Sequence, residues 1–248
     1  MSAPSPEVSA PVAVVTGASR GLGAGLAATF AQHGYRLGLC ARTRPTAPPG
    51  AQAVTAAVDV TDAEALDRFG SAVVDRFGRI DLWVNNAGVL EPIAFLADAD
   101  SAALARHVDV NVKGVLFGSR TFARHVRDRD GTGVLVNMTS GASRTIYEGM
   151  AVYCASKAAV DMATRVVAQE EAAHGLAAYA VAPGVVDTAM QVMMREAPIE
   201  RLPSVGRFVA LKKAEAFNSP EWVARFLMDL VEGGERPEDV VVRVPDQN

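Results

Sequence analysis

Short apolar runs alternate along the chain with longer segments in which apolar residues recur every three or four positions. The first pattern is typical of buried strands and the second of amphipathic helices. We expect strands at residues 12–15, 35–40, 51–60, 81–85, 133–138 and 176–183 and in the closing VVVRV segment. No hairpin dipeptide separates these runs, and helical segments lie between them. This alternation predicts an α/β fold, a parallel sheet with helices on both faces.

For three of the expected helices, the sequence also predicts a capping residue or the residues at which the helix begins and ends. Thr61 is expected to cap the helix that buries Leu66, Phe69 and Val73 on its apolar face. One helix is expected from about Ser101 to Arg127. A last helix is expected to open at Ser219-Pro220, with serine as the cap and proline in the first turn.

The chain reads as one domain with one irregular segment. Residues 1–11 are expected to be a flexible tail, and residues 12–248 one α/β domain. Residues 185–218 interrupt the strand–helix rhythm with an apolar insertion that includes Met190, Met193 and Met194. Because methionine adapts to varied shapes, the insertion is a candidate substrate lid. A helical hairpin that simply packs on the core explains the pattern equally well.

Composition excludes several classes of protein. Half of the 248 residues are apolar and 21% are charged, as in ordinary globular proteins. A formal charge of −4 argues against a general nucleic-acid binder. Cys40 and Cys154 form neither a disulfide framework nor a zinc site, and no histidine spacing suggests a metal. With no signal peptide and no apolar run of membrane-spanning length, we expect a cytoplasmic protein.

A glycine-rich turn, TGASRGLG, occupies residues 16–23 between the first strand and the first helix. Glycines at such a place allow a tight turn and a close approach of the backbone to a pyrophosphate. The free N–H groups of the following helix favour the phosphates. The turn therefore predicts a dinucleotide site.

A second candidate site is the segment from Ser140 to Lys157. Tyr153 and Lys157 are four residues apart in a helical segment, so both side chains lie on one face. An ammonium beside a phenol favours the phenolate and lowers its pKa. Ser140 ends an apolar strand whose carboxyl end can bring the hydroxyl to the same point. These groups suit proton transfer to or from a carbonyl oxygen. Cys154, on another face, is expected to be a core residue.

Taken together, these motifs resemble the short-chain dehydrogenase/reductase family. They are TGASRGLG, NNAG at 85–88, Asn111 in NVKG, Ser140, Tyr153-x-x-x-Lys157 and Pro183-Gly184, in the family's order and over nearly the whole chain. The resemblance implies a doubly wound Rossmann-type domain of about seven strands. It implies Tyr153 as general acid/base, Ser140 as the group that orients the substrate oxygen, and Asn111 as the anchor of a proton-relay water. Lys157 would hold the nicotinamide ribose.

The same resemblance implies a set of cofactor-binding residues around these motifs. They are Gly17, Ser19, Arg20, Gly21, Leu22, Gly23, Asp59, Val60, Asn86, Ala87, Gly88, Tyr153, Lys157, Pro183, Gly184, Val186 and Thr188. The choice of nicotinamide depends on the end of the second strand. There Ala41 stands where a carboxylate would bind a 2′-hydroxyl, and Arg42 follows, with Arg44 near. We therefore predict NADP(H), with Arg20 as a possible second contact to the 2′-phosphate.

The C-terminal part narrows the resemblance. PGVVDTAMQ, LKK and SPEWVARFLMDLV resemble sepiapterin reductase and the bacterial benzil reductases, which reduce vicinal dicarbonyls with NADPH. Asp246 lies roughly where a pterin reductase holds the guanidine-like edge of its substrate, but a solvated terminal aspartate fits as well. The expected substrate contacts are Ser140, Tyr147, Met190, Met194 and Asp246.

The sequence thus predicts an NADPH-dependent reductase of a ketone or vicinal diketone. A reductase of another carbonyl, such as a 3-oxoacyl thioester or a natural-product ketone, stays open. So does an NADP(H) sensor without turnover, although a sensor has no need of Ser140, Tyr153 and Lys157 together. We expect a small-molecule substrate, no nucleic-acid or membrane partner, no metal, and a homodimer or homotetramer.

Overall fold

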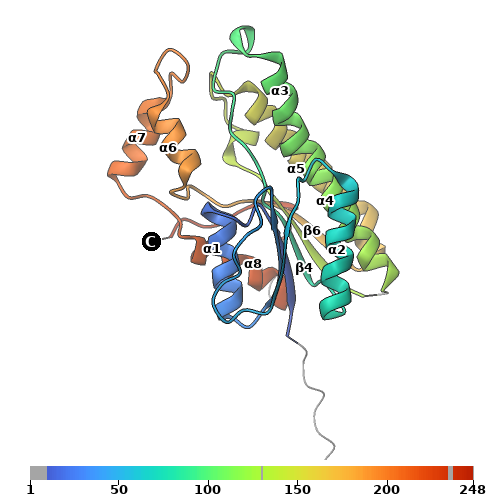
Figure 1. The fold of residues 1–248 in the computed structure, drawn as a ribbon. Coiled ribbons are helices and arrows are strands. Elements are labelled where there is room, and N and C mark those ends of the chain that lie inside the picture. The colour runs from blue at the N-terminus through green and yellow to red at the C-terminus, as the bar shows by residue number, and fades with distance from the viewer. Residues whose placement is uncertain (1–9, 130, 234–236, 248) are drawn as a thin grey trace, which may run out of the picture.

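The computed structural model describes residues 10–129, 131–233 and 237–247, so nearly all of the expected tail lies outside it. Within these residues, seven strands form one parallel sheet in the order β3-β2-β1-β4-β5-β6-β7 (Figure 1). The strands are β1 (Val12–Thr16), β2 (Arg36–Ala41), β3 (Ala53–Ala57), β4 (Leu82–Asn85), β5 (Gly133–Met138), β6 (Leu176–Ala182) and β7 (Val241–Arg243). The parallel α/β fold predicted from the sequence is confirmed.

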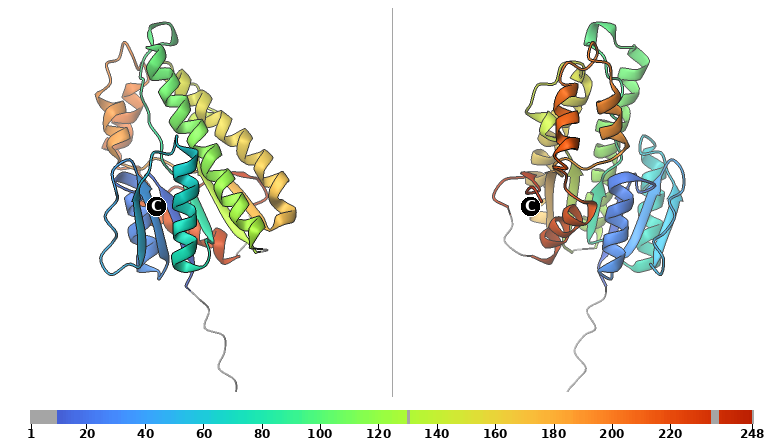
Figure 2. Two further views of the ribbon diagram at one scale, coloured as in Figure 1. Left: turned by 45° about the vertical axis from the view of Figure 1, so that its right-hand side comes forward. Right: turned by 90° about the vertical axis from the view of Figure 1, so that its left-hand side faces the viewer.

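Helices cover both faces of this sheet (Figures 1 and 2). The α-helices of the described residues are α1 (Gly21–Gln32), α2 (Ala63–Phe77), α3 (Ser101–Val108), α4 (Gly114–Asp128), α5 (Ala151–Glu171), α6 (Ala189–Glu196), α7 (Val205–Lys213) and α8 (Pro220–Glu232), of which α6 and α7 do not lie on a face of the sheet. Alternate strand residues point to opposite faces. Ala13 and Val15 therefore pack with α1 and α8, whereas Val12 and Val14 pack with α2 and α4. The doubly wound arrangement follows from this division.

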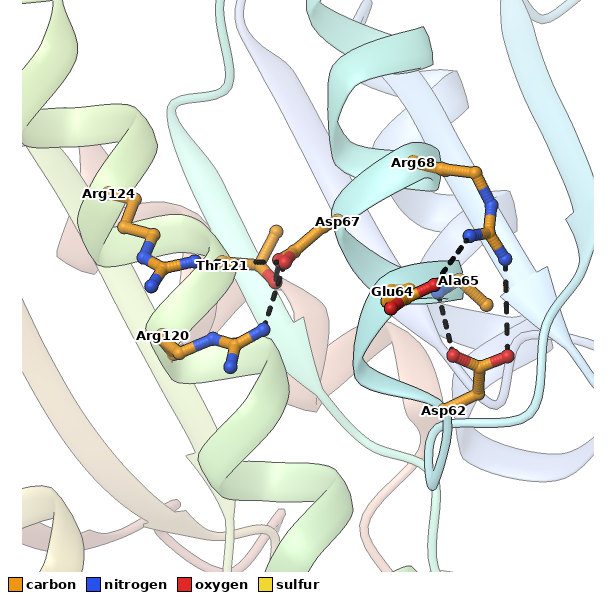
Figure 3. A network of polar contacts seen from close by, with 8 residues as sticks. All are labelled: Asp62, Glu64, Ala65, Asp67, Arg68, Arg120, Thr121 and Arg124. Carbon is orange, nitrogen blue, oxygen red and sulfur yellow. Dashed lines mark hydrogen bonds and ion pairs between the residues drawn. The ribbon is translucent and has the colours of Figure 1, made fainter.

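Polar contacts at α2 fix its start and its distance from α4 (Figure 3). The carboxylate of Asp62 accepts a hydrogen bond from the N–H of Ala65 at 3.0 Å. Asp62, and not Thr61 as predicted, is therefore the N-cap, because the hydroxyl of Thr61 is donated to Asp59. Further along α2, Asp67 pairs with Arg120 of α4 at 2.9 Å, which ties the two helices together.

Two other sequence predictions need correction. The helix expected from Ser101 to Arg127 is divided into α3 and α4 by a π-helical turn, Asp109–Lys113. The wide turn places Asn111 in the interior, at 1% exposure. The third strand ends at Ala57, short of Val60, and the Val58 N–H makes one last hydrogen bond to the Ala41 carbonyl of β2 at 2.8 Å. In contrast, Ser219 caps α8 as predicted, and its hydroxyl accepts the N–H of Trp222.

The segment at 185–218 forms α6 and α7, which stand beyond the carboxyl ends of the strands (Figures 1 and 2). Asp187, at their base, pairs with Arg195 of α6 at 2.9 Å and with Lys212 of α7 at 2.6 Å. This shared carboxylate holds the two helices side by side. Among the described residues, no helix has both the length and the apolar character that a membrane span needs.

Candidate active site

The three predicted catalytic side chains lie together where β5 ends and α5 begins. Tyr153 and Lys157 are each only 8% exposed. The hydroxyl of Tyr153 is hydrogen-bonded with Ser140, and Lys157 Nζ lies 5.7 Å from the centre of the Tyr153 ring. Helical spacing brings the phenol and the ammonium onto one face, and the end of β5 brings the serine to them. The structure thus places the predicted catalytic groups at one point.

Burial is the largest influence on the pKa values of both Tyr153 and Lys157. It raises the pKa of Tyr153, and the hydrogen bond with Ser140 acts in the opposite direction. Burial also lowers the pKa of Lys157 to about 8, while the carboxylate of Asp161 acts to raise it. The pKa of the phenol is therefore raised in this structure, opposite to the direction that the sequence analysis expects from Lys157. Desolvation disfavours the charged phenolate.

The glycine-rich turn packs directly against the NNAG segment. Gly17 has a φ of +68°, and a Cβ there would lie 2.8 Å from the Cα of Ala87. A Cβ on Gly23 would lie 2.5 Å from the carbonyl oxygen of Gly17. Thr16 Oγ1 accepts the N–H groups of Asn86 and Ala87 at 3.0 and 3.1 Å. Side chains larger than hydrogen would separate these segments, so the glycines are required for the cradle.

This cradle fits the phosphates of a dinucleotide. Arg20 is the N-cap of α1 and makes no side-chain capping bond, so the N–H groups of the first turn have no side-chain partner. Such N–H groups bind anions. Gly21 and Leu22 belong to this turn, Ser19 is exposed just before it, and a Cβ on Gly21 would lie 3.5 Å from the Thr188 methyl group. A nicotinamide dinucleotide would therefore be held by the turn, with Thr188 opposite.

The remaining cofactor residues surround this cradle. Ala18 N–H donates to the Cys40 carbonyl at 3.1 Å, which joins the glycine-rich turn to the end of β2, and Arg42 is exposed just after that strand. Asp59 accepts the N–H and hydroxyl of Thr61, at 2.9 and 2.8 Å. Buried Val60 lies against Gly114, where an added Cβ would be 2.7 Å from it. Gly88 borders Asn111, and Val186 is buried with α1 and α8.

Asn218, which the sequence analysis missed, holds the Pro183-Gly184 loop in place. It is 3% exposed, and its Nδ2 donates to the carbonyls of Pro183 and Pro245 at 2.9 and 3.1 Å. Its Oδ1 accepts the N–H of Gln247 at 2.7 Å. One amide therefore joins the loop to the C-terminal segment. No local pattern identifies such a residue, because its partners are distant in the chain.

An apolar cluster surrounds the Tyr153 hydroxyl. Leu90, Met150, Met194, Leu202 and Phe208 are its main buried members besides Tyr153. Met190, from α6, lies over the phenol, with its sulfur 3.9 Å from the hydroxyl. The Tyr147 ring packs on Phe208 at 5.8 Å. The insertion at 185–218 therefore supplies part of the surroundings of the Tyr153 phenol, including Met190 and Met194, which are predicted substrate contacts.

A cleft of ≈ 810 Å³ opens beside this cluster. It runs between the 91–106 segment and the α6–α7 region, and Ile93, Phe95 and Met193 contribute to its walls. Ile93 and Met193 also pack against the apolar cluster around Tyr153, so the cleft and the cluster adjoin.

Asp246 lies exposed near the C-terminus, paired with Arg243 at 2.5 Å. No group of metal-ligating side chains occurs among the described residues. Cys154 is partly buried against the apolar cluster, as expected of a packing residue.

Comparison with known proteins identifies the family. The model for short chain dehydrogenases matches residues 11–198, about three quarters of the chain. The chain belongs to the short-chain dehydrogenase family. It is 31% identical to benzil reductase ((S)-benzoin forming) of Bacillus subtilis, over 89% of this chain and 93% of that protein. It is 30% identical to the Bacillus cereus benzil reductase, over 94% of this chain and 98% of that protein.

A solved structure agrees with this assignment. The crystal structure of the KRED1-Pglu enzyme superposes with a TM-score of 0.81 at 31% identity, covering 94% of this chain and 99% of that chain. The family resemblance seen in the sequence, including that to bacterial benzil reductases, is thereby confirmed. The protein is a short-chain oxidoreductase of small molecules, and its family uses a nicotinamide cofactor.

Proposed function

We propose that this short-chain dehydrogenase is an NADPH-dependent carbonyl reductase that acts on a ketone or a vicinal diketone of the benzil or sepiapterin type. One observation carries the proposal. The buried Tyr153 hydroxyl, bonded with Ser140, faces an apolar cluster at the same end of the sheet as the glycine-rich cradle. Such a site can hold an apolar carbonyl compound beside a nicotinamide. When bound, the cofactor supplies the hydride.

The residues of the site then have separate roles. Ser140 orients the carbonyl oxygen, and Tyr153 donates the proton that this oxygen needs after reduction. A pKa raised by burial keeps the phenol protonated at neutral pH, which suits a general acid. The Lys157 ammonium stabilises the phenolate that remains. The proton relay through Asn111 is part of the proposal.

The choice of NADPH rests on Arg42. It follows β2 directly and is exposed, and Ala41 leaves no carboxylate there to bind a 2′-hydroxyl. A guanidinium binds phosphate through charge-assisted hydrogen bonds, so it favours the 2′-phosphate. Arg20, exposed at the start of α1, is the second proposed contact.

The surroundings of Tyr153 support a bulky, largely apolar substrate. The adjoining cleft of ≈ 810 Å³ is within the size range of small-molecule sites. Met190, Met193 and Met194 give α6 an adaptable surface, so we assign α6 and α7 the role of a substrate lid. Tyr147 would contact the substrate from the other side. For a pterin-like substrate, Asp246 would bind the guanidine-like edge once its ion pair with Arg243 opens.

We further propose that the protein is one domain from residue 12 onwards, that it works in the cytoplasm, and that it assembles as a homodimer or homotetramer. The family resemblance sets the expectation of an oligomer, and size measurements in solution would test the assembly.

The deciding experiment measures NADPH and NADH oxidation by the purified protein with benzil, a pterin diketone, a simple ketone and a 3-oxoacyl thioester. We expect NADPH consumption, fastest with a diketone. A faster reaction with the thioester would favour the other reductase. NADPH binding without turnover of any carbonyl would favour a sensor. Equal efficiency with NADH would refute the role of Arg42.

A further inference from the structure

His107 is a buried histidine directly behind the catalytic tyrosine. It lies on α3, four residues before Asn111, and is 0% exposed. Its Nδ1 lies 2.8 Å from the carbonyl oxygen of Glu91. Its Nε2 lies 2.9 Å from Asn111 Nδ2 and 3.1 Å from Ser156 Oγ. Both ring nitrogens are therefore engaged, and each contact comes from a different part of the site.

The hydrogen bonds of Asn111 fix the tautomer of His107. Asn111 Oδ1 accepts the N–H of Val89 at 2.8 Å, so the other atom of the amide is the nitrogen. That nitrogen donates one hydrogen to the Val89 carbonyl at 2.8 Å, and its second hydrogen faces His107 Nε2 at 2.9 Å, with Ser156 Oγ further away at 3.5 Å. Nε2 must therefore be the acceptor. The proton lies on Nδ1, where it is donated to the Glu91 carbonyl.

Ser156 supplies no proton to Nε2, whereas the Glu91 carbonyl can only accept and so requires the proton on Nδ1. The Ser156 hydroxyl donates to the carbonyl of Tyr153 at 2.8 Å and also lies near His107 Nε2. A proton on Nε2 would face the amide of Asn111 with a second donor. Burial lowers the pKa of His107, and the charge of Lys157 lowers it further, while the bond to the Glu91 carbonyl acts to raise it. A neutral imidazole is therefore the form that this pocket holds.

The imidazole also packs against the phenol. The ring centres of His107 and Tyr153 are 6.0 Å apart, and the ring planes meet at 82°. This edge-to-face arrangement supports the Tyr153 ring. His107 thus contacts the tyrosine ring, the amide of Asn111 and the serine bonded to the tyrosine backbone.

We propose that His107 is a positioning residue of the reductase, a neutral imidazole protonated at Nδ1 that sets the orientation of Tyr153 and Asn111. This inference rests on the proposed function. Its consequence is an acid limit to the reaction, because an imidazolium disrupts the contact with Asn111. The charged and titratable groups that face the ring are Lys157 and Tyr153 of α5. Glu91 faces it only with its carbonyl, and Arg106 and Asp109 flank it on its own helical segment.

The test compares His107→Phe and His107→Gln with the wild type. Phenylalanine keeps the ring but has no acceptor, whereas the glutamine amide oxygen can accept from Asn111. We expect His107→Phe to lower kcat by about 10- to 100-fold, the usual cost of a small misplacement, with the NADPH Kd changed by less than about twofold. His107→Gln should recover most of kcat and lose the acid limit, because no imidazole remains to be protonated.

His125→Phe is the matched control. His125, on α4, also accepts a hydrogen bond at Nε2, from the Ile80 N–H at 3.0 Å, and burial likewise lowers its pKa. The His125→Phe substitution should lower the melting temperature of the protein without changing kcat. If His107→Phe loses as much stability as His125→Phe and keeps kcat within about twofold of the wild type, the positioning role is wrong. An acid limit that persists in His107→Gln would also overturn the assignment.

A second measurement does not depend on turnover. Nitrogen-15 NMR of the histidine rings, assigned with the two variants, should show His107 protonated at Nδ1 and bare at Nε2 at neutral pH. A proton on Nε2 would overturn the inference. If the wild type reduced no carbonyl, the proposed function would fail, while the NMR result would still decide the tautomer.

Discussion

The Lys157 ammonium donates a hydrogen bond to the Met138 carbonyl across 2.8 Å, joining α5 to the last residue of β5. Ser140 follows Met138 by two residues, so this bond also fixes the distance between the catalytic serine and the helix that carries Tyr153. The ammonium is buried. The carboxylate of Asp161, one helical turn further on, acts to raise the pKa of Lys157.

Asp161 therefore sets the alkaline limit of the reaction. Burial lowers the pKa of Lys157 to about 8, and Asp161 acts to raise it. The protonated lysine is the active form, so activity falls as the pH rises through this pKa. Asp161→Asn removes the supporting charge, and the alkaline limb of kcat/KM should move to lower pH by about one unit. Asp239→Asn, which removes an exposed carboxylate paired with Arg165, should leave the limb in place. Identical profiles for wild type and Asp161→Asn would contradict this assignment.

The role of Tyr153 as general acid predicts a change in the chemical step alone. Tyr153→Phe keeps the buried ring and removes the proton donor, so kcat should fall by about 10²- to 10⁴-fold. NADPH affinity, measured by fluorescence titration, should stay within about twofold. Tyr179→Phe, at a buried tyrosine of β6, serves as the control and should keep full activity. Loss of NADPH binding in Tyr153→Phe would show that the tyrosine serves mainly to hold the cofactor.

Arg42 is expected to strengthen the binding of NADPH and to have no effect on the binding of NADH. A charge-assisted contact to phosphate contributes about 1.5–3 kcal/mol, so Arg42→Ala should weaken NADPH binding by about 10- to 100-fold. NADH binding should be unchanged. Arg225→Ala removes an exposed cation of α8 that pairs with Glu221, and it should alter neither. Equal losses for both cofactors would mean that Arg42 supports the structure and does not select the 2′-phosphate.

Gly149 is expected to control how closely the segment between α6 and α7 packs against the segment before α5. It has a φ of +82°, and a Cβ there would lie 1.8 Å from the Arg201 carbonyl oxygen. Gly78 has the same φ, with no atom within 4 Å of an added Cβ. Each alanine substitution carries the left-handed backbone cost of about 1–2 kcal/mol. Gly149→Ala should destabilise the protein further and raise KM for the carbonyl. Equal melting temperatures and KM values for the two variants would show that the contact at Arg201 is unimportant.

Sequence reasoning located the parts of the site that depend on local spacing. The four-residue step from Tyr153 to Lys157 puts both on one helical face wherever the helix lies, and the glycine turn after β1 is fixed by its neighbours in the chain. It did not locate the π-helical turn that buries Asn111, because that turn depends on packing against Val89 and on the partner His107. His107 has a sequence signal, its four-residue spacing from Asn111, but the spacing does not reveal the Glu91 carbonyl or Ser156 on the other sides of the ring.

By itself, then, the sequence determined the order of strands and helices, the parallel sheet and the family, since periodicity and short motifs are local properties. It also predicted the catalytic set. Tertiary structure decided the electrostatics and the support of that set. Burial raises the pKa of Tyr153 against the influence expected from Lys157, and Asn218 and His107 hold segments that are far apart in the chain. Desolvation and long-range hydrogen bonds arise only when distant residues surround a group, and no spacing within one segment encodes them.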